Sequence, residues 1–176
     1  MIGGSGSVAV LLVLPAVMLM MLAESRISIR HERALRDRGA IEPAGDVYAT
    51  MRWAYPGAFI AMAAEGLVFG PAPAVVALAG VIVMAAAKAL KWWAMTSLGV
   101  RWTFRVLIVP GAPLITRGPY AVWRHPNYIA VVGELIAMAM ITGAFVTGPL
   151  ATLLFSWLIW RRIQVEERAL RYPTCS

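Results

Sequence analysis

Residues 117–128 read RGPYAVWRHPNY and form a polar, aromatic cluster at the edge of a long apolar run. A second cluster, RIQVEERAL at residues 162–170, follows the last apolar run of the chain. Both clusters lie at the flanks of apolar segments, where a membrane-crossing chain reaches water as well as lipid. We expect the rest of the chain to be the frame that holds these two clusters together.

The composition is typical of an integral membrane protein and not of a soluble one. Of the 176 residues, 60% are hydrophobic and only 14% are charged, which departs strongly from the average soluble domain. The single cysteine, Cys175, permits no internal disulfide and indicates no redox compartment. The net charge of +7 does not predict nucleic-acid binding, because no basic stripe occurs away from the flanks of the apolar runs.

The apolar runs predict an all-α membrane protein with five transmembrane helices. A hydrocarbon core is about 30 Å thick, and the runs that we assign to spans cover residues 6–23, 47–69, 72–94, 128–146 and 148–160. Only Gly70-Pro71-Ala72-Pro73 separates the second span from the third, and a turn around Thr147-Gly148-Pro149 separates the fourth from the fifth. Each of these pairs should therefore form a helical hairpin.

The basic residues support this span count. With five spans, all sixteen Lys and Arg residues fall on one side, and the positive-inside rule makes that side cytoplasmic and the N-terminus external. Merging or dropping one helix would scatter the charges over both sides. A cleaved signal peptide is the alternative for residues 6–23, but that run lacks a basic segment before it and has five arginines behind it.

Residues 24–46 alternate charged and apolar positions at helical spacing. This pattern predicts a short interfacial helix that ends at Gly39. The alternative is a solvated basic loop that serves topology alone.

The connection between the third and fourth spans, residues 95–127, has its own aromatic and basic residues, which is typical of a functional segment. Its glycines and prolines impose turns, so that Leu114 and Ile115 can offer backbone groups to a ligand. Pro126 fits the first turn of the fourth helix and puts His125 at its cap, with the ring facing the cytoplasmic mouth.

Ionisable residues inside or beside the spans are the remaining candidates. Glu134 lies about two turns inside the membrane, where a carboxyl faces the bundle and either attracts a cation or packs in a hydrogen-bonded form. Arg162 and Glu166 are four residues apart on one helical face. They form either a weak surface ion pair or a site in which Arg162 receives an anionic substrate group and Glu166 binds hydroxyl or ammonium groups of a cofactor.

Other kinds of site have little support. His31 and His125 are the only histidines and there is no cysteine cluster, so we expect no metal site. No serine or threonine has a paired base at a spacing typical of a hydrolytic triad. A small membrane scaffold or transporter stays open as the non-enzyme alternative, although the chain has no inverted repeat.

The order and spacing of these residues resemble the isoprenylcysteine carboxyl methyltransferase family of integral membrane enzymes. The resemblance covers roughly residues 100–170 and rests on Gly118-Pro119-Tyr120, Arg124-His125-Pro126-Asn127-Tyr128, Glu134, Arg162, Glu166-Glu167 and Leu170. It implies S-adenosylmethionine as methyl donor, in a cytoplasm-facing pocket between the last helices. It also implies a lipophilic acceptor that enters from the bilayer. The partners that we expect are this acceptor and membrane lipids, and no nucleic acid.

The resemblance also assigns site residues. Arg162 would be the substrate-side cation, and Glu134 is the second catalytic candidate. The cofactor would contact Ala112, Pro113, Leu114, Ile115, Tyr120, His125, Pro126, Asn127, Tyr128 and Glu166, and Arg105 stands where prenylcysteine enzymes carry a cofactor-contacting glutamine. The implied organisation is a single domain over residues 1–176, with three spans and the interfacial helix in 1–94 and the catalytic half in 95–176.

The N-terminal half resembles a bacterial subgroup that O-methylates alkylresorcinols or alkylpyrones made by type III polyketide synthases. The residues concerned are Ala23-Glu24-Ser25-Arg26, His31-Glu32-Arg33, Arg38-Gly39-Ala40 and Arg101-Trp102-Thr103. We therefore expect an O-methyltransferase for such a hydroxyl in the inner membrane of a bacterium. The alternatives are a prenylcysteine carboxylate or a phospholipid nitrogen as acceptor, or an NADPH-dependent sterol reductase of the same broad membrane architecture.

Methyl transfer fits the residue types in both clusters. The reaction is an in-line displacement for which positioning supplies much of the rate. Arg162 can stabilise an attacking anion in a dry site. Tyr120, Tyr128 and Trp123 can pack on adenine or on a sulfonium by cation–π contact.

Overall fold

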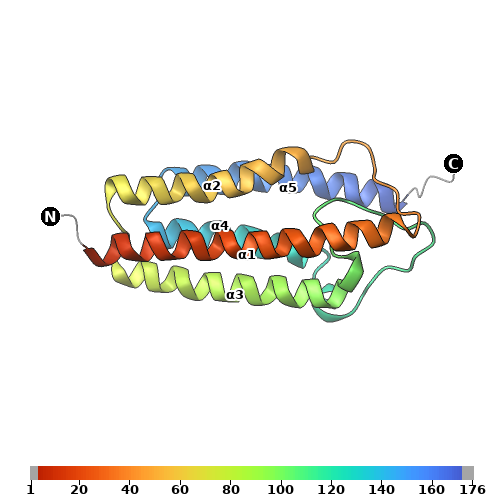
Figure 1. The fold of residues 1–176 in the computed structure, drawn as a ribbon, viewed down its shortest axis with the longest axis horizontal. Helices are drawn as coiled ribbons and strands as arrows, with labels where there is room; N and C mark the ends of the chain where they lie inside the picture. The colour runs from red at the N-terminus through yellow and green to blue at the C-terminus, as the bar shows by residue number, and fades with distance from the viewer. Residues whose placement is uncertain (1–3, 172–176) are drawn as a thin grey trace.

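In a computed structural model, residues 4–171 are described and form an elongated bundle of five long helices that run side by side (Figure 1). Two short 3-10 helices lie in the connection between the third and fourth long helices, and the described residues contain no β-strand. The helices are α1 (Gly4–Arg36), α2 (Tyr48–Phe69), α3 (Ala74–Leu98), η1 (Gly99–Arg101), η2 (Gly118–Ala121), α4 (Pro126–Thr142) and α5 (Thr147–Arg171). Cys175 lies outside this range.

Both predicted hairpins are present. Residues 70–73 join α2 to α3, and residues 143–146 join α4 to α5. The turn predicted around residues 147–149 is wrong by a few positions, because Gly143 takes a left-handed conformation (φ +74°) and ends α4. Pro149 falls in the first turn of α5, where a missing N–H costs nothing.

The predicted interfacial helix is wrong as a separate element. Helix α1 runs unbroken from Gly4 to Arg36 and contains both the first apolar run and most of the charged segment. No glycine or proline interrupts residues 16–36, and Ser28 donates a 2.7 Å hydrogen bond to Glu32 one turn later. The helix ends before Gly39, which has a φ of +77°. Helix α5 continues beyond the predicted span 148–160 to Arg171, so that Arg162 and Glu166 lie on the same helix, as expected.

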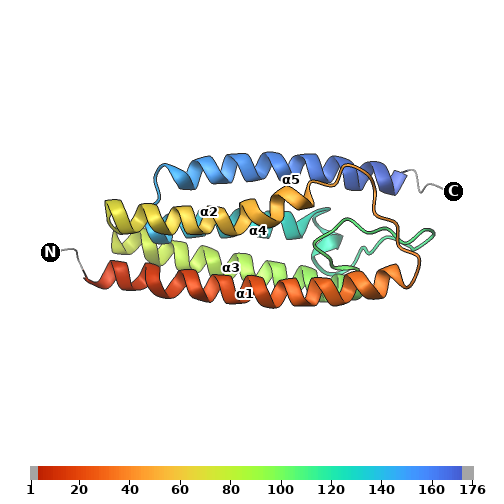
Figure 2. The same ribbon diagram turned by 45° about the horizontal axis from the view of Figure 1, so that its top comes forward.

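One end of the bundle carries the basic residues and both sequence clusters. The C-terminal ends of α1, α3 and α5 and the N-terminal ends of α2 and α4 meet there, as the two views show (Figure 1, Figure 2). We call it the charged end. Which side of a membrane the charged end faces stays a prediction.

Length and composition qualify two helices as possible membrane spans, Val10–Arg36 and Ala74–Arg101, and Pro126–Thr142 is a shorter apolar helix. The crossing of a membrane by all five helices stays a prediction. The outer surface is apolar, with exposed side chains that include Leu11, Leu19, Val75, Leu78, Phe145 and Leu153. Exposed tryptophans lie nearer the charged end, at residues 53, 92, 93, 157 and 160, as in the aromatic belts of membrane proteins.

The core lies between α1, α2, α4 and α5. Phe59, Met62, Leu135 and Met138 are completely buried in it. Helices α2 and α4 approach closely at Gly66, where an added Cβ would lie 2.2 Å from the carbonyl oxygen of Thr142. Only glycine permits this contact, which fixes how α2 crosses α4.

Candidate functional site

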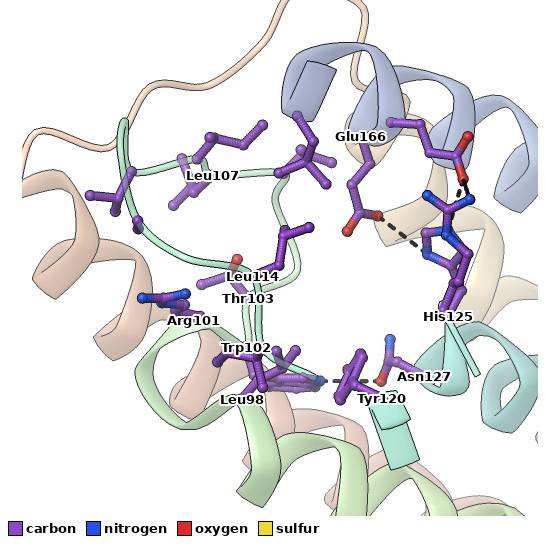
Figure 3. Close-up of a pocket in the computed structure, with 18 of the residues that line it drawn as sticks. Leu98, Arg101, Trp102, Thr103, Leu107, Leu114, Tyr120, His125, Asn127 and Glu166 are labelled. Carbon is purple, nitrogen blue, oxygen red and sulfur yellow. Dashed lines mark hydrogen bonds and ion pairs between the residues drawn. The ribbon is translucent and has the colours of Figure 1, made fainter. Parts of the chain in front are cut away.

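A cavity of about 360 Å³ opens at the charged end and lies within the size range of small-molecule sites. Its walls come from residues 98–116, from the segment 120–128 and from the last turns of α5. Figure 3 shows Trp102, Tyr120, His125, Asn127 and Glu166 around a common space. The two sequence clusters therefore meet in space, although more than thirty positions separate them.

One wall is residues 102–117, which we call the pocket loop, and α1 holds its beginning. The hydroxyl of Ser28 accepts a 2.7 Å hydrogen bond from the backbone N–H of Phe104. The Nδ1 of His31 donates to the carbonyl of Trp102 over 2.8 Å. On the far side, the indole N–H of Trp102 donates to Asn127 Oδ1 over 3.2 Å. The loop is thus suspended between α1 and the start of α4.

Residues 37–47, the linker from α1 to α2, hold the middle of the pocket loop. The backbone groups of Ile41 and Ile108 exchange two hydrogen bonds of 2.8 and 3.0 Å. Glu42 Oε1 accepts a 2.6 Å hydrogen bond from Arg105, whose guanidinium lies 4.8 Å from the ring centre of Tyr48. Hydrogen bonding to Glu42 raises the pKa of Arg105, so that the arginine stays charged.

Tyr128 connects the two sequence clusters directly. Its hydroxyl donates a 3.0 Å hydrogen bond to Glu166 Oε2 and accepts one of 2.9 Å from the Nε of Arg162. Arg162 is 5% exposed and also donates to the carbonyl of Phe104. Its Nη1 lies 3.6 Å from Asp46. Each of the three guanidinium nitrogens of Arg162 therefore has a protein partner at the back of the cavity.

His125 lies between the paired glutamates of α5. Its Nδ1 is 3.9 Å from Glu166 Oε2 and its Nε2 is 3.5 Å from Glu167 Oε1 (Figure 3). Arg124 Nη1 lies 3.5 Å from the same Glu167 oxygen. The imidazole stacks on the ring of Tyr128 with the centroids 5.6 Å apart. The two carboxylates hold the imidazole at the cavity wall.

Tyr120, from η2, adds an uncharged hydroxyl to the lining. Burial raises the pKa of Tyr120, and the nearby charge of Glu166 raises it further. The phenol therefore stays protonated at neutral pH and can donate a hydrogen bond to a ligand.

Most of the residues predicted for the site line this one cavity. They are Arg105, Ala112, Pro113, Leu114, Ile115, Tyr120, His125, Asn127, Tyr128, Arg162 and Glu166. Pro126 is buried at the first position of α4 and is not part of the lining. It shapes the turn that presents His125 and Asn127.

Glu134 does not line the cavity. It is completely buried between Lys88 and Lys91 of α3, at 3.1 and 3.3 Å, and accepts a 2.6 Å hydrogen bond from Tyr55 of α2. Both lysines also pair with Glu24 of α1. The cations that Glu134 attracts are thus the protein's own, and its place in the structure is that of a cross-link between four helices.

The lining also contains residues that the sequence interpretation did not assign to the site, among them Leu35, Leu98, Arg101, Trp102, Thr103, Leu107 and Glu167. Arg101 donates to the carbonyl of Pro113 and so closes the pocket loop on itself. Arg101, Trp102, Thr103 and Glu167 belong to the segments that carry the family resemblance, whereas no motif marks Leu35, Leu98 or Leu107. No local pattern marks Ser28 or Asp46 as supports of the loop, because both contacts span more than fifty residues.

The chain is similar to known proteins in sequence. The profile of the isoprenylcysteine carboxyl methyltransferase (ICMT) family matches residues 75–172, which is more than half of the chain. YpbQ of Bacillus subtilis, described as uncharacterized, is 30% identical over 149 residues, which cover 85% of this chain and 89% of YpbQ. An uncharacterized protein of Haemophilus influenzae is 26% identical over 151 residues, 83% of this chain and 86% of that protein. The chain belongs to the isoprenylcysteine carboxyl methyltransferase family, whose members are membrane methyltransferases.

Proposed function

We propose that this protein is an S-adenosylmethionine-dependent O-methyltransferase whose acceptor is an amphiphile held at the charged end of the bundle. The proposal rests on the cavity in which the Tyr128 hydroxyl is hydrogen-bonded to Arg162 and Glu166. This cavity brings together the two segments on which the family resemblance rests. Family membership supports methyl transfer independently of this geometry.

The lining fits a cofactor that carries positive charge. S-adenosylmethionine supplies a methyl group from a sulfonium and also carries an ammonium group. The carboxylates of Glu166 and Glu167 attract such cations, and the rings of Tyr120 and Tyr128 offer π faces to a cation or to adenine. The backbone of residues 112–115 would supply hydrogen bonds to the polar atoms of the cofactor that these side chains do not contact.

The lining and its surroundings favour an acceptor with an apolar tail. Leu35, Leu98, Leu107, Leu114 and Leu170 contribute apolar surface to the cavity, and the outer surface of the bundle is apolar as well. An acceptor can therefore place its reacting hydroxyl in the cavity and its tail in lipid. We favour a long-chain phenol or pyrone of the alkylresorcinol or alkylpyrone type over a prenylated cysteine.

O-methylation of a hydroxyl releases a proton, and His125 is placed to take it up. Histidine is the side chain that most often acts as a general base, and the ring of His125 lies at the cavity wall beside Glu166 and Glu167. Arg162 keeps a positive charge at the back of the cavity, which favours the anionic form of the acceptor. Positioning supplies the rest of the rate, since both reactants would be held in one pocket.

Two measurements on the protein purified in detergent test this function. Calorimetry should detect binding of S-adenosylhomocysteine, the product of methyl transfer from the cofactor. Radiolabelled methyl transfer is then measured into an alkylresorcinol, an alkylpyrone, an S-farnesylcysteine derivative and phosphatidylethanolamine. We expect label in the first two. Label in the carboxyl group of the farnesylcysteine derivative would change the acceptor and keep O-methylation. Label in phosphatidylethanolamine would replace O-methylation with N-methylation.

Variants complete the experiment. Glu166→Gln should weaken S-adenosylhomocysteine binding, because it removes the charge that faces His125 and Tyr128. Asp37→Asn removes a carboxylate from the exposed linker and should bind as wild type. Absence of binding together with absence of label in every acceptor would overturn the function and leave a membrane scaffold or transporter. Protection against heat by NADPH alone would indicate the reductase.

A further inference from the structure

Asp46 lies in the linker between α1 and α2, outside the region that the family profile matches. Its side chain is only 5% exposed, although the residue belongs to a surface connection. We propose that Asp46 is a positioning residue for the cofactor wall, acting through Arg162 and the pocket loop. This inference rests on the proposed function.

The two oxygens of the Asp46 carboxylate have different partners. Oδ2 accepts a 3.1 Å hydrogen bond from the backbone N–H of Val106 in the pocket loop. Oδ1 accepts a 3.1 Å hydrogen bond from the backbone N–H of Tyr48 and lies 3.6 Å from the Nη1 of Arg162. One side chain thus joins the start of α2, the pocket loop and α5.

Asp46 and Arg162 together clamp the pocket loop. Arg162 donates to the carbonyl of Phe104, and Asp46 accepts from the N–H of Val106. The two members of one ion pair therefore hold backbone groups on either side of Arg105. Because Thr103, Arg105 and Val106 line the cavity, the position of this wall depends on the pair.

The same pair extends to the opposite wall. Arg162 donates through Nε to the Tyr128 hydroxyl, which donates to Glu166. A continuous polar chain therefore runs from Asp46 through Arg162 and Tyr128 to Glu166, the carboxylate assigned to the cofactor. A shift of the guanidinium at one end changes the direction of the Glu166 side chain at the other.

Asp46 is also needed to compensate the buried positive charge of Arg162. A buried guanidinium needs a compensating anion, since an unpaired buried charge is strongly destabilising. Within the part of the chain whose side chains are described, Asp46 makes the only ion pair of Arg162. Without Asp46, Arg162 would turn toward Glu166 and compete with a cationic ligand for that carboxylate.

Capping of α2 alone does not explain Asp46. The turn into α2 needs one oxygen, which Oδ1 supplies to the N–H of Tyr48 two residues later. The second oxygen points to a loop residue sixty positions away. This difference makes Asp46→Asn informative, because asparagine keeps the size and one oxygen but has neither the charge nor the second acceptor.

The first test is binding of S-adenosylhomocysteine by calorimetry to wild type, Asp46→Asn and Asp37→Asn. We expect the Kd of Asp46→Asn to rise about tenfold, the size typical of losing one buried polar partner. Asp37→Asn, a matched change in the same exposed linker, should keep the wild-type Kd. If Asp46 acts through Arg162, Asp46→Asn should cause no further loss in an Arg162→Gln background. Additive losses, or an unchanged Kd in the single variant, would overturn the inference.

The second test does not need the cofactor. Hydrogen–deuterium exchange of the full chain in lipid nanodiscs should show faster exchange of the Val106 amide and its neighbours in Asp46→Asn but not in Asp37→Asn. Unchanged exchange at Val106 would refute the clamp even if the protein binds no S-adenosylhomocysteine. Failure of wild type to bind S-adenosylhomocysteine, with faster exchange in Asp46→Asn, would refute the proposed function and keep the positioning role for the loop.

Discussion

The Nε of Arg162 donates a 2.9 Å hydrogen bond to the hydroxyl of Tyr128, which precedes it by 34 positions in the chain. The hydroxyl in turn donates a 3.0 Å hydrogen bond to Glu166. Tyr128 thereby connects the start of α4 to the last turns of α5 at the cavity. The arrangement makes the hydroxyl, and not only the aromatic ring, important for the shape of the site.

Removal of this hydroxyl should weaken cofactor binding more than it weakens the fold. In Tyr128→Phe the ring stays, but Arg162 and Glu166 lose their common partner. We expect the Kd for S-adenosylhomocysteine to rise roughly tenfold, since a buried polar group left unpaired costs about 1–3 kcal/mol. Calorimetry on the purified protein measures the change.

Tyr48→Phe is the matched control. The Tyr48 hydroxyl makes no hydrogen bond within the described residues, and its ring, which packs against Arg105, is kept. Equal losses in the two variants would show that the Tyr128 hydroxyl has no special place in the site.

Glu134 should matter for stability and not for cofactor contact. Glu134→Gln would leave Lys88 and Lys91 with only Glu24 as counter-charge. Breaking a buried ion pair in this way typically costs about 3–5 kcal/mol, so the unfolding midpoint in detergent should fall markedly. The fraction that remains folded should bind S-adenosylhomocysteine with the wild-type Kd, because Glu134 lies outside the cavity lining.

A paired substitution provides the control for Glu134. Adding Lys91→Met to Glu134→Gln removes one positive charge together with the negative one and should recover part of the lost stability. A variant that keeps the wild-type unfolding midpoint but loses methyl transfer would instead support the catalytic role expected from the sequence.

Much of the fold could be predicted because its signals are local. The second apolar run was placed at residues 47–69, and α2 spans Tyr48–Phe69. Glycine and proline turns determine both hairpins. The continuation of α1 to Arg36 was missed because charges at helical spacing fit a separate surface helix as well as an extension of the first span. Tertiary contacts at Ser28 and His31 decide between the two.

The residues of the candidate site also fall into those that the sequence predicts and those that it does not. Motif residues such as His125 and Tyr128 could be found because they cluster in the sequence. The supports of the pocket loop could not, because Ser28, Glu42 and Asp46 reach it from linear distances of about sixty to eighty residues. Polar side chains in a linker follow no periodic pattern, so only the folded chain reveals which backbone group each one holds.

The crossing of α2 and α4 depends on the absence of a side chain at Gly66. In Gly66→Ala the new Cβ would lie 2.2 Å from the carbonyl oxygen of Thr142, so that the helices must move apart. Such overpacking typically costs about 1–3 kcal/mol, which should lower the unfolding midpoint in detergent. Gly57→Ala, in the same helix but with nothing within 4 Å, should be neutral or slightly stabilising, because alanine favours helix. Similar destabilisation in both variants would contradict the close crossing.

Glu42 makes the anchoring of the linker dependent on pH. Partial burial raises the pKa of Glu42, but the hydrogen bonds from Arg105 and Arg36 outweigh it and hold the pKa below the ordinary 4.5. A carboxyl with a lowered folded-state pKa contributes stability that is fully present above its unfolded value and is lost as pH falls through the folded value. The contribution of Glu42 should therefore be constant from pH 7 to about pH 5 and disappear below 4.5.

Comparison of wild type with Glu42→Gln measures this contribution. The difference in unfolding midpoint should be constant near neutral pH and shrink toward zero in acid, because protonated Glu42 and glutamine are then equally uncharged. Asp37→Asn, which removes a carboxylate without a described ion pair, should show no such convergence with wild type. A difference between wild type and Glu42→Gln that persists unchanged in acid would mean that the charge of Glu42 is not its cause.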